Sequence, residues 1–314
     1  MSGPAGVQAH SNTVAQWASF TIVAAVLTVS LLLLARQSQQ LLEAESGPTQ
    51  AGSSARDDAG DGDLGNQTDR FTGTRPLSPE AIPSDTEALT PRTDRKKSSE
   101  SADFSPTDPR QDIELTPALL LANVALTQGG VIVLVLAAAW YFEIPATALG
   151  ITGDPTSTGL PAVALGIGFG VVLWIGNELS TAVADAVGAS YDESLRELLS
   201  PSGAGGWLTL FGLVLPIIAL SEELLFRAAL IGVPAAGFGI SPWLLAVGAS
   251  LAFALGHGAQ GRVGIVVTGL LGFVLAAGYI RSGSLLVVVV AHYLINGLEF
   301  FVHEYLGVGA IFSQ

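Results

Sequence analysis

The sequence is poor in the residues on which several functional classes depend. It contains no cysteine in 314 residues, a single methionine, and four histidines. Without thiols there can be no disulfide framework, thiolate metal site or cysteine nucleophile, so any metal must be held by histidine and carboxylate. Charged residues make up 13% of the chain, well below the roughly 25% of an ordinary soluble domain. This deficit argues against a soluble enzyme.

Basic residues are scarce as well. The chain has 13 Lys and Arg against 27 Asp and Glu, and its formal net charge is −14. A nucleic-acid binder needs clustered Lys and Arg to neutralise phosphates, so we exclude that class. Hydrophobic residues account for 49% of the chain, and the mean hydropathy is +0.53. This composition indicates a membrane protein whose surroundings include lipids.

Residues 1–36 form the first expected unit. The run 13–35 contains no charged residue and is about as long as the ~20 apolar residues that cross a bilayer as a helix. A secretory signal begins with a cationic segment, which residues 1–17 lack. We therefore expect a retained N-terminal transmembrane anchor.

Residues 37–113 have the opposite composition. Ser, Pro, Gly, Thr and Asp dominate this segment, and aromatic residues are few. Such a segment cannot bury enough apolar surface to offset the entropy lost on ordering. We therefore expect a disordered acidic linker.

Apolar segments return after Pro117 and fill the third unit, 114–314. Prolines and glycines, Pro234 and Gly283 among them, break this unit into helices. The polar stretch 181–199 predicts an interfacial amphipathic helix. The predicted fold is an all-α, multi-pass bundle in the cell membrane, with one anchor and about six core helices. The candidate core spans are 117–142, 160–179, 206–232, 242–260, 262–281 and 284–302.

Small residues within the spans predict where helices pack closely. Gly166 and Gly170 are four residues apart and share one helical face, a spacing that favours close helix contact in membranes. No period of 20–50 residues repeats, so the sequence does not support a duplicated transporter.

A cluster of ionisable residues interrupts the span 206–232. Each such group near the middle of a membrane helix costs roughly 2.5–3.5 kcal/mol on insertion scales, so it requires a partner or a task. Glu223 and Arg227 are four residues apart and predict an ion pair on one helical face. Glu222 points about 100° away and has no basic partner at that spacing. It is therefore a candidate proton acceptor.

Two later spans carry His257 and His292, and Asn296 follows His292 on the same helical face. Glu222, His257 and His292 are the ligand types of a catalytic zinc ion that keeps one position open for water. The same residues could instead hold a water for a glutamate base without any metal. In that case Asn296 and one histidine would donate hydrogen bonds to an oxyanion. The sequence leaves both mechanisms open.

Together these motifs resemble those of a known family. Glu222-Glu223-x-x-x-Arg227, Phe253-x-x-x-His257 and His292-x-x-x-Asn296 follow one another on successive expected helices. In this order they are similar to the motifs of the CPBP family of intramembrane proteases. That family includes the type II CAAX prenyl endopeptidases, or Rce1-like enzymes, and the bacteriocin-processing or immunity (Abi) relatives. The resemblance covers roughly residues 117–302 and excludes the anchor and the linker.

The resemblance implies an intramembrane endopeptidase that acts on membrane-associated peptides or proteins, CAAX-type prenylated ones included. It implies that Glu222 activates the hydrolytic water with His257. It further implies that His292 and Asn296 complete a metal site or an oxyanion hole, with Glu223 and Arg227 in support.

Several other interpretations remain at this point. A non-catalytic membrane scaffold or bacteriocin-immunity protein would share the fold, and membrane Glu and His also occur in proton- or ion-coupled carriers. A rhomboid-like serine protease would pair Ser250 with His292. His303 and Glu304 follow the last expected span and are expected in a solvated interfacial position.

Overall fold

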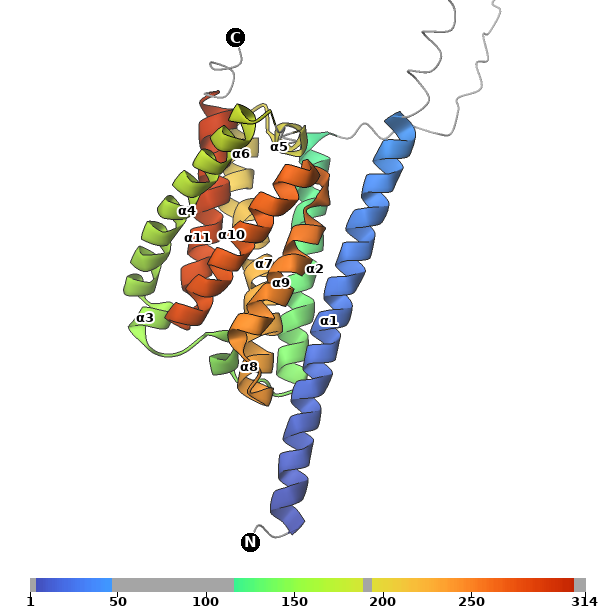
Figure 1. Ribbon diagram of the computed structural model, residues 1–314, viewed down its shortest axis with the longest axis vertical. Helices are drawn as coiled ribbons and strands as arrows, with labels where there is room; N and C mark the ends of the chain where they lie inside the picture. The colour runs from blue at the N-terminus through green and yellow to red at the C-terminus, as the bar shows by residue number, and fades with distance from the viewer. Residues whose placement is uncertain (1–3, 47–115, 189–193, 308–314) are drawn as a thin grey trace, which may run out of the picture. The chain divides into compact units, whose positions relative to one another are not determined.

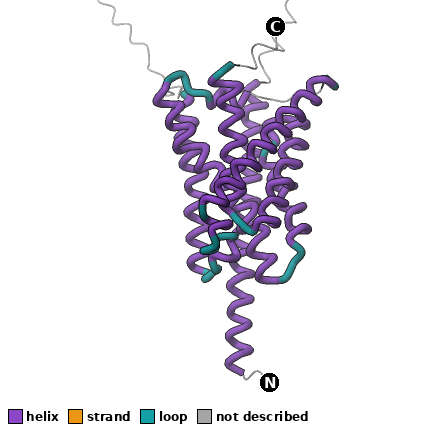
Figure 2. Tube along the Cα trace, turned by 90° about the vertical axis from the view of Figure 1, so that its left-hand side faces the viewer, coloured by secondary structure: helices purple, strands orange, loops and turns teal. Residues whose placement is uncertain are grey.

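The computed structural model describes residues 4–46, 116–188 and 194–307. Within these ranges the regular elements are all helices (Figures 1 and 2). Six of them are long and apolar enough to cross a membrane, so the predicted all-α polytopic bundle is confirmed. Most of the expected linker lies outside the described residues. The elements are α1 (Pro4–Ser46), α2 (Pro117–Tyr141), η1 (Ala146–Leu149), α3 (Pro155–Thr158), α4 (Leu160–Ala186), α5 (Ser194–Leu199), α6 (Ala204–Thr209), η2 (Leu210–Val214), α7 (Leu215–Glu223), η3 (Leu224–Gly232), α8 (Val233–Phe238), α9 (Pro242–Gly256), η4 (Gly258–Gln260), α10 (Gly261–Ser282), α11 (Leu285–Glu299) and η5 (Phe300–Tyr305).

The anchor helix α1 packs against the bundle and continues past its expected end at residue 36. Its last ten residues, 37–46, had been expected in the linker, but their Gln, Leu, Glu and Ala content favours a helix. Phe20, Ala24 and Thr28 are spaced by four residues and are all buried. This face of α1 contacts α2, η3, α8 and α9, and the helix runs along one side of the bundle in Figure 1.

The expected boundaries of 181–199 and 242–260 were wrong. The stretch 181–199 does not form one amphipathic helix: α4 continues to Ala186, and only Ser194–Leu199 forms the short helix α5. The apolar residues at 182, 183, 184 and 186 extend the preceding span instead of starting a new element. The span 242–260 is also shorter than expected, because α9 ends at Gly256 after 15 residues.

Residues 204–238 form one long apolar helix that passes through two π-helical segments, η2 and η3. Pro216 follows η2 and Pro234 follows η3, each as the second residue of the next α-helical segment. A proline lacks the N–H of a regular helical turn and clashes with the carbonyl of residue i−4. The wider π-helical turn before each proline accommodates this change, so Pro234 does not end the helix as expected. The helix ends at Gly239, which has a positive φ of 67°.

The contact between α4 and α11 is the most extensive of the bundle. A β-carbon at Gly166 would lie 2.8 Å from the backbone oxygen of Val287, and one at Gly170 would lie 2.8 Å from that of Ala291. Such distances are too short for any side chain, so the two glycines allow the backbones to approach closely. The sequence predicted this use of the Gly166 and Gly170 spacing.

We expect Gly170→Ala to lower the free energy of unfolding by about 1–3 kcal/mol, because its methyl group would overpack the α4–α11 contact. The matched control is Gly168→Ala on the same helix, where a β-carbon would meet nothing within 4 Å. That variant should be neutral or up to about 1 kcal/mol more stable, since alanine favours a helix over glycine. Unfolding of the purified protein in mixed micelles measures both changes. Equal effects of the two variants would contradict the packing role.

Candidate active site

Glu223 and Arg227 form a buried ion pair where α7 continues into η3, near the middle of the bundle. Arg227 Nη1 lies 2.8 Å from Glu223 Oε1, and the two side chains are 1% and 0% exposed. The second guanidinium nitrogen, Nη2, donates to the backbone oxygen of Gly272 at 2.9 Å. The guanidinium carbon also lies 4.8 Å from the ring centre of Phe253. The predicted pair is present, and contacts with α10 and α9 hold it in place.

His292, on α11, joins this ion pair to Glu222. Its Nδ1 lies 2.7 Å from Glu223 Oε1, and its Nε2 lies 3.6 Å from Glu222 Oε2. An ionised carboxylate only accepts hydrogen bonds, so Nδ1 carries the proton that is donated to Glu223. This bond fixes the orientation of the ring and turns Nε2 toward Glu222. Glu223 therefore positions His292, a role that its helical pairing with Arg227 alone did not predict.

Gln128, on α2, is a site residue that the sequence analysis missed. Its Nε2 donates to Glu222 Oε1 at 3.4 Å, and its Oε1 accepts a hydrogen bond from Ser221 Oγ. The signal was a side-chain amide within an apolar span, the same signal that drew attention to Asn296. Gln128 and His292 thus contact the two different oxygens of Glu222.

A cavity of about 190 Å³ opens beside Glu222. His257 also lines it, just after the end of α9, and its Nδ1 lies 2.8 Å from the backbone oxygen of Phe253. Because a carbonyl only accepts, Nδ1 is the protonated nitrogen of neutral His257 and Nε2 is its acceptor. The other lining residues come from four segments: Thr28, Leu31, Leu32 and Ala35 of α1; Thr127, Gln128 and Val131 of α2; Ser221, Leu225 and Phe226 of α7 and η3; and Phe253 and Gly256 of α9.

The remaining sequence candidates differ in their placement. Asn296 lies one helical turn after His292 and is half-buried, and its side-chain amide makes no hydrogen bond with any residue that the structure describes. Ser250 Oγ is buried and has no hydrogen-bond partner within the described ranges. Since both ring nitrogens of His292 face glutamates, the Ser250–His292 dyad of a rhomboid-like protease is not formed.

The fit of a zinc ion depends on whether Glu222, His257 and His292 converge. Glu222 and His292 lie close enough to share an ion. A metal site needs at least three ligand atoms close to one another. In the described part of the chain, however, the group of three whose ligand atoms lie within 4.8 Å of one another is Glu178, Glu299 and His303. Glu222, His257 and His292 do not gather as closely, so they do not fit one ion in this arrangement.

Comparison with known families agrees with the motifs. Residues 204–298 match the family model described as type II CAAX prenyl endopeptidase Rce1-like. This range contains the seven motif residues from Glu222 to Asn296. No curated protein and no solved structure matches the chain. Over residues 204–298 this multi-pass membrane protein is therefore similar to the Rce1-like family, which confirms the resemblance seen in the three motifs.

Proposed function

We propose that the chain is an intramembrane endopeptidase that hydrolyses peptide bonds of membrane-associated substrates, CAAX-type prenylated ones included, in the cell membrane. The observation that carries the proposal is the position of Glu222. Its carboxylate borders the cavity and faces an imidazole, His292, whose orientation a second, fully buried glutamate maintains. A scaffold would not need a carboxylate held at the edge of a cavity inside the membrane.

Glu222 is the proton acceptor in the proposed reaction. It removes a proton from a water molecule while the water oxygen forms a bond to the carbonyl carbon of the substrate. The tetrahedral intermediate then collapses, the C–N bond breaks, and protonated Glu222 returns the proton to the leaving amine. Gln128 and His292 contact separate oxygens of this carboxylate and thereby fix its orientation.

The negative charge that develops on the carbonyl oxygen requires donors. Asn296 is suited to this task, because its amide makes no hydrogen bond with the described residues and lies one turn from His292. His257, with Nδ1 engaged by Phe253, presents Nε2 to the cavity as a second base, or as a donor when protonated. Both assignments agree with the roles that the Rce1-like resemblance implies.

The cavity lining favours a largely apolar substrate segment. Leucine, valine, alanine and phenylalanine make up half of the residues that surround it, and the hydrogen-bonded group of Glu222, Gln128 and Ser221 forms its polar end. A peptide bond at the polar end would leave flanking apolar groups, a prenyl chain or a membrane helix, against the remaining wall. The apolar lining fits a prenyl chain and a membrane helix equally.

The test is cleavage by the purified chain reconstituted in liposomes. Peptides that end in a farnesylated CAAX sequence, and unmodified transmembrane peptides, serve as substrates, with products identified by mass spectrometry. We expect cleavage of at least one class, and a rate that changes less than about twofold after divalent ions are removed with a chelator. Loss of activity on chelation that zinc restores would replace the glutamate mechanism with a metal-dependent one. The absence of cleavage in both peptide classes would leave the scaffold as the better explanation.

A further inference from the structure

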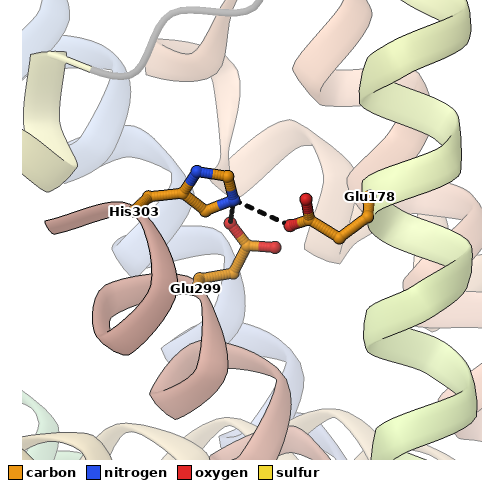
Figure 3. Close-up of side chains that lie close together, drawn as sticks. All are labelled: Glu178, Glu299 and His303. Atoms are coloured by element: carbon orange, nitrogen blue, oxygen red, sulfur yellow. Dashed lines mark hydrogen bonds and ion pairs between the residues drawn. The ribbon is translucent and has the colours of Figure 1, made fainter. Parts of the chain in front are cut away.

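A second cluster of ionisable groups lies outside the cavity. It consists of Glu178 on α4, Glu299 at the end of α11 and His303 on η5 (Figure 3). His303 was expected in a solvated position after the last span, and this expectation was wrong. The helix continues to Tyr305, and the His303 ring points at Glu178 of the neighbouring helix. Glu299 lies seven residues after His292, or about 10 Å along the helix, so this cluster is separate from the Glu222 site.

The geometry of the cluster matches that of metal ligands. His303 Nε2 lies 2.8 Å from Glu178 Oε1 and 3.8 Å from Glu299 Oε2. One ligand atom from each of the three residues lies within 4.8 Å of the others. Two ligands bound to one zinc ion at about 2.0–2.2 Å in tetrahedral geometry are ~3.4 Å apart. The separations in the cluster bracket this value, so an ion requires only small side-chain adjustments.

Neighbouring side chains orient the two carboxylates of the last helix. Asn177, which precedes Glu178 on α4, donates from Nδ2 to Glu299 Oε1 at 2.7 Å. Arg196, on α5, donates from Nη1 to Glu299 Oε2 at 3.0 Å and from Nε to Glu304 Oε1 at 2.9 Å. Such outer contacts are typical of metal sites, where they hold the ligands ready to bind.

Carboxylates outnumber guanidinium groups in the cluster. Glu178, Glu299 and Glu304 bring three carboxylates, whereas Arg196 contributes one guanidinium. The group lies near the ends of two membrane spans. A divalent cation would offset negative charge on these carboxylates. The imidazole favours zinc and similar transition ions over magnesium and calcium, which prefer oxygen ligands.

We propose that Glu178, Glu299 and His303 bind one divalent transition-metal ion of the zinc class. The ligand side chains are 33%, 15% and 21% exposed, so an ion can enter from the solvent and a water molecule can complete its coordination. The site joins α4 to α11 and η5 by a bond that does not involve the cavity. It stands independently of the proposed endopeptidase activity.

The test is metal binding by the full chain, purified in detergent and stripped of ions with a chelator. Zn²⁺ is titrated calorimetrically, and Co²⁺ is titrated by visible absorption, which reports the change in its coordination geometry. We expect one saturable site. Glu178→Gln and His303→Asn should each weaken binding at least about 10-fold, because each removes a ligand. Mg²⁺ at the same concentrations should not compete.

Two controls make the assignment specific. Glu304→Gln removes a carboxylate that contacts Arg196 but is not a proposed ligand, and Glu222→Gln removes the carboxylate of the cavity. Both variants should retain binding within a few-fold of the wild type. Gel filtration and helical circular dichroism establish that each variant is folded. If one of the two ligand variants does not fold, the isosteric Glu299→Gln replaces it in the binding measurement.

Two results would overturn the proposal. The first is no saturable Zn²⁺ binding up to about 1 mM, which would make the cluster an ion-pair network without a metal. The second is Zn²⁺ binding that Glu222→Gln abolishes and the ligand variants leave unchanged, which would place the ion in the cavity instead. Because the two sites respond to different variants, failure of this proposal is distinguishable from failure of the proposed peptidase activity.

Discussion

Glu222→Gln is expected to reduce the cleavage rate by about 10²–10⁴-fold, the contribution of a general base. The amide has almost the same shape as the carboxylate and can still contact Gln128 and His292, so the cavity should keep its form. It cannot accept a proton from water, so the chemical step is lost. Substrate binding should remain, with the decrease appearing in kcat and little change in KM.

The matched control is Glu143→Gln, the same chemical change at an exposed residue in the loop after α2. This variant should cleave at the wild-type rate. Cleavage is followed in liposomes by mass spectrometry, and unfolding in micelles is recorded for both variants. A Glu222→Gln protein that is folded and still cleaves at more than about a tenth of the wild-type rate would remove Glu222 from the role of base.

Arg227→Met should be the most destabilising single substitution at the site, at about 3–5 kcal/mol. It leaves Glu223 fully buried without its cation and removes the hydrogen bond to Gly272 and the contact with the Phe253 ring. Met fills much of the same volume, so a cavity is not the main cause. The loss should appear as a lower midpoint of unfolding in mixed micelles.

A double substitution separates the ion pair from the packing of Arg227. Glu223→Gln together with Arg227→Met removes both charges, so it should cost less than Arg227→Met alone. Arg281→Met is the matched single control, since Arg281 is exposed and lies over the Trp243 ring at 5.6 Å. That variant should cost no more than about 1 kcal/mol. An equal cost for the single and double substitutions at the buried pair would show that the charge on Glu223 is not the source of the instability.

Local sequence patterns predicted the features that depend on neighbouring residues. Apolar length predicted most of the spans, and the spacing of Glu223 and Arg227 predicted their ion pair. Pro234 was expected to end its helix, but a π-helical segment earlier in the same helix absorbs its effect on the backbone. Proline does disrupt a regular α-helical turn, but a wider π-helical turn before it allows the helix to continue.

Long-range contacts were beyond the reach of these patterns. Gln128 reaches Glu222 across 94 residues of sequence, and His303 reaches Glu178 across 125. No periodicity relates such positions, and only the packing of α2 and α4 against the later helices brings them together. His303 was therefore expected to be solvated, although its partners lie on an adjacent helix.

The anchor helix α1 belongs to neither the Rce1-like region nor its motifs, yet Thr28, Leu31, Leu32 and Ala35 form one side of the cavity that contains Glu222. A chain without α1 would have a cavity open on that side, while the residues proposed for the chemistry would be intact. Exchange of these four positions would thus reshape one wall of the cavity, whereas Glu222, His257, His292 and Asn296 all lie within residues 204–298. One boundary of the proposed substrate chamber is therefore supplied by a part of the polypeptide that the family match does not cover.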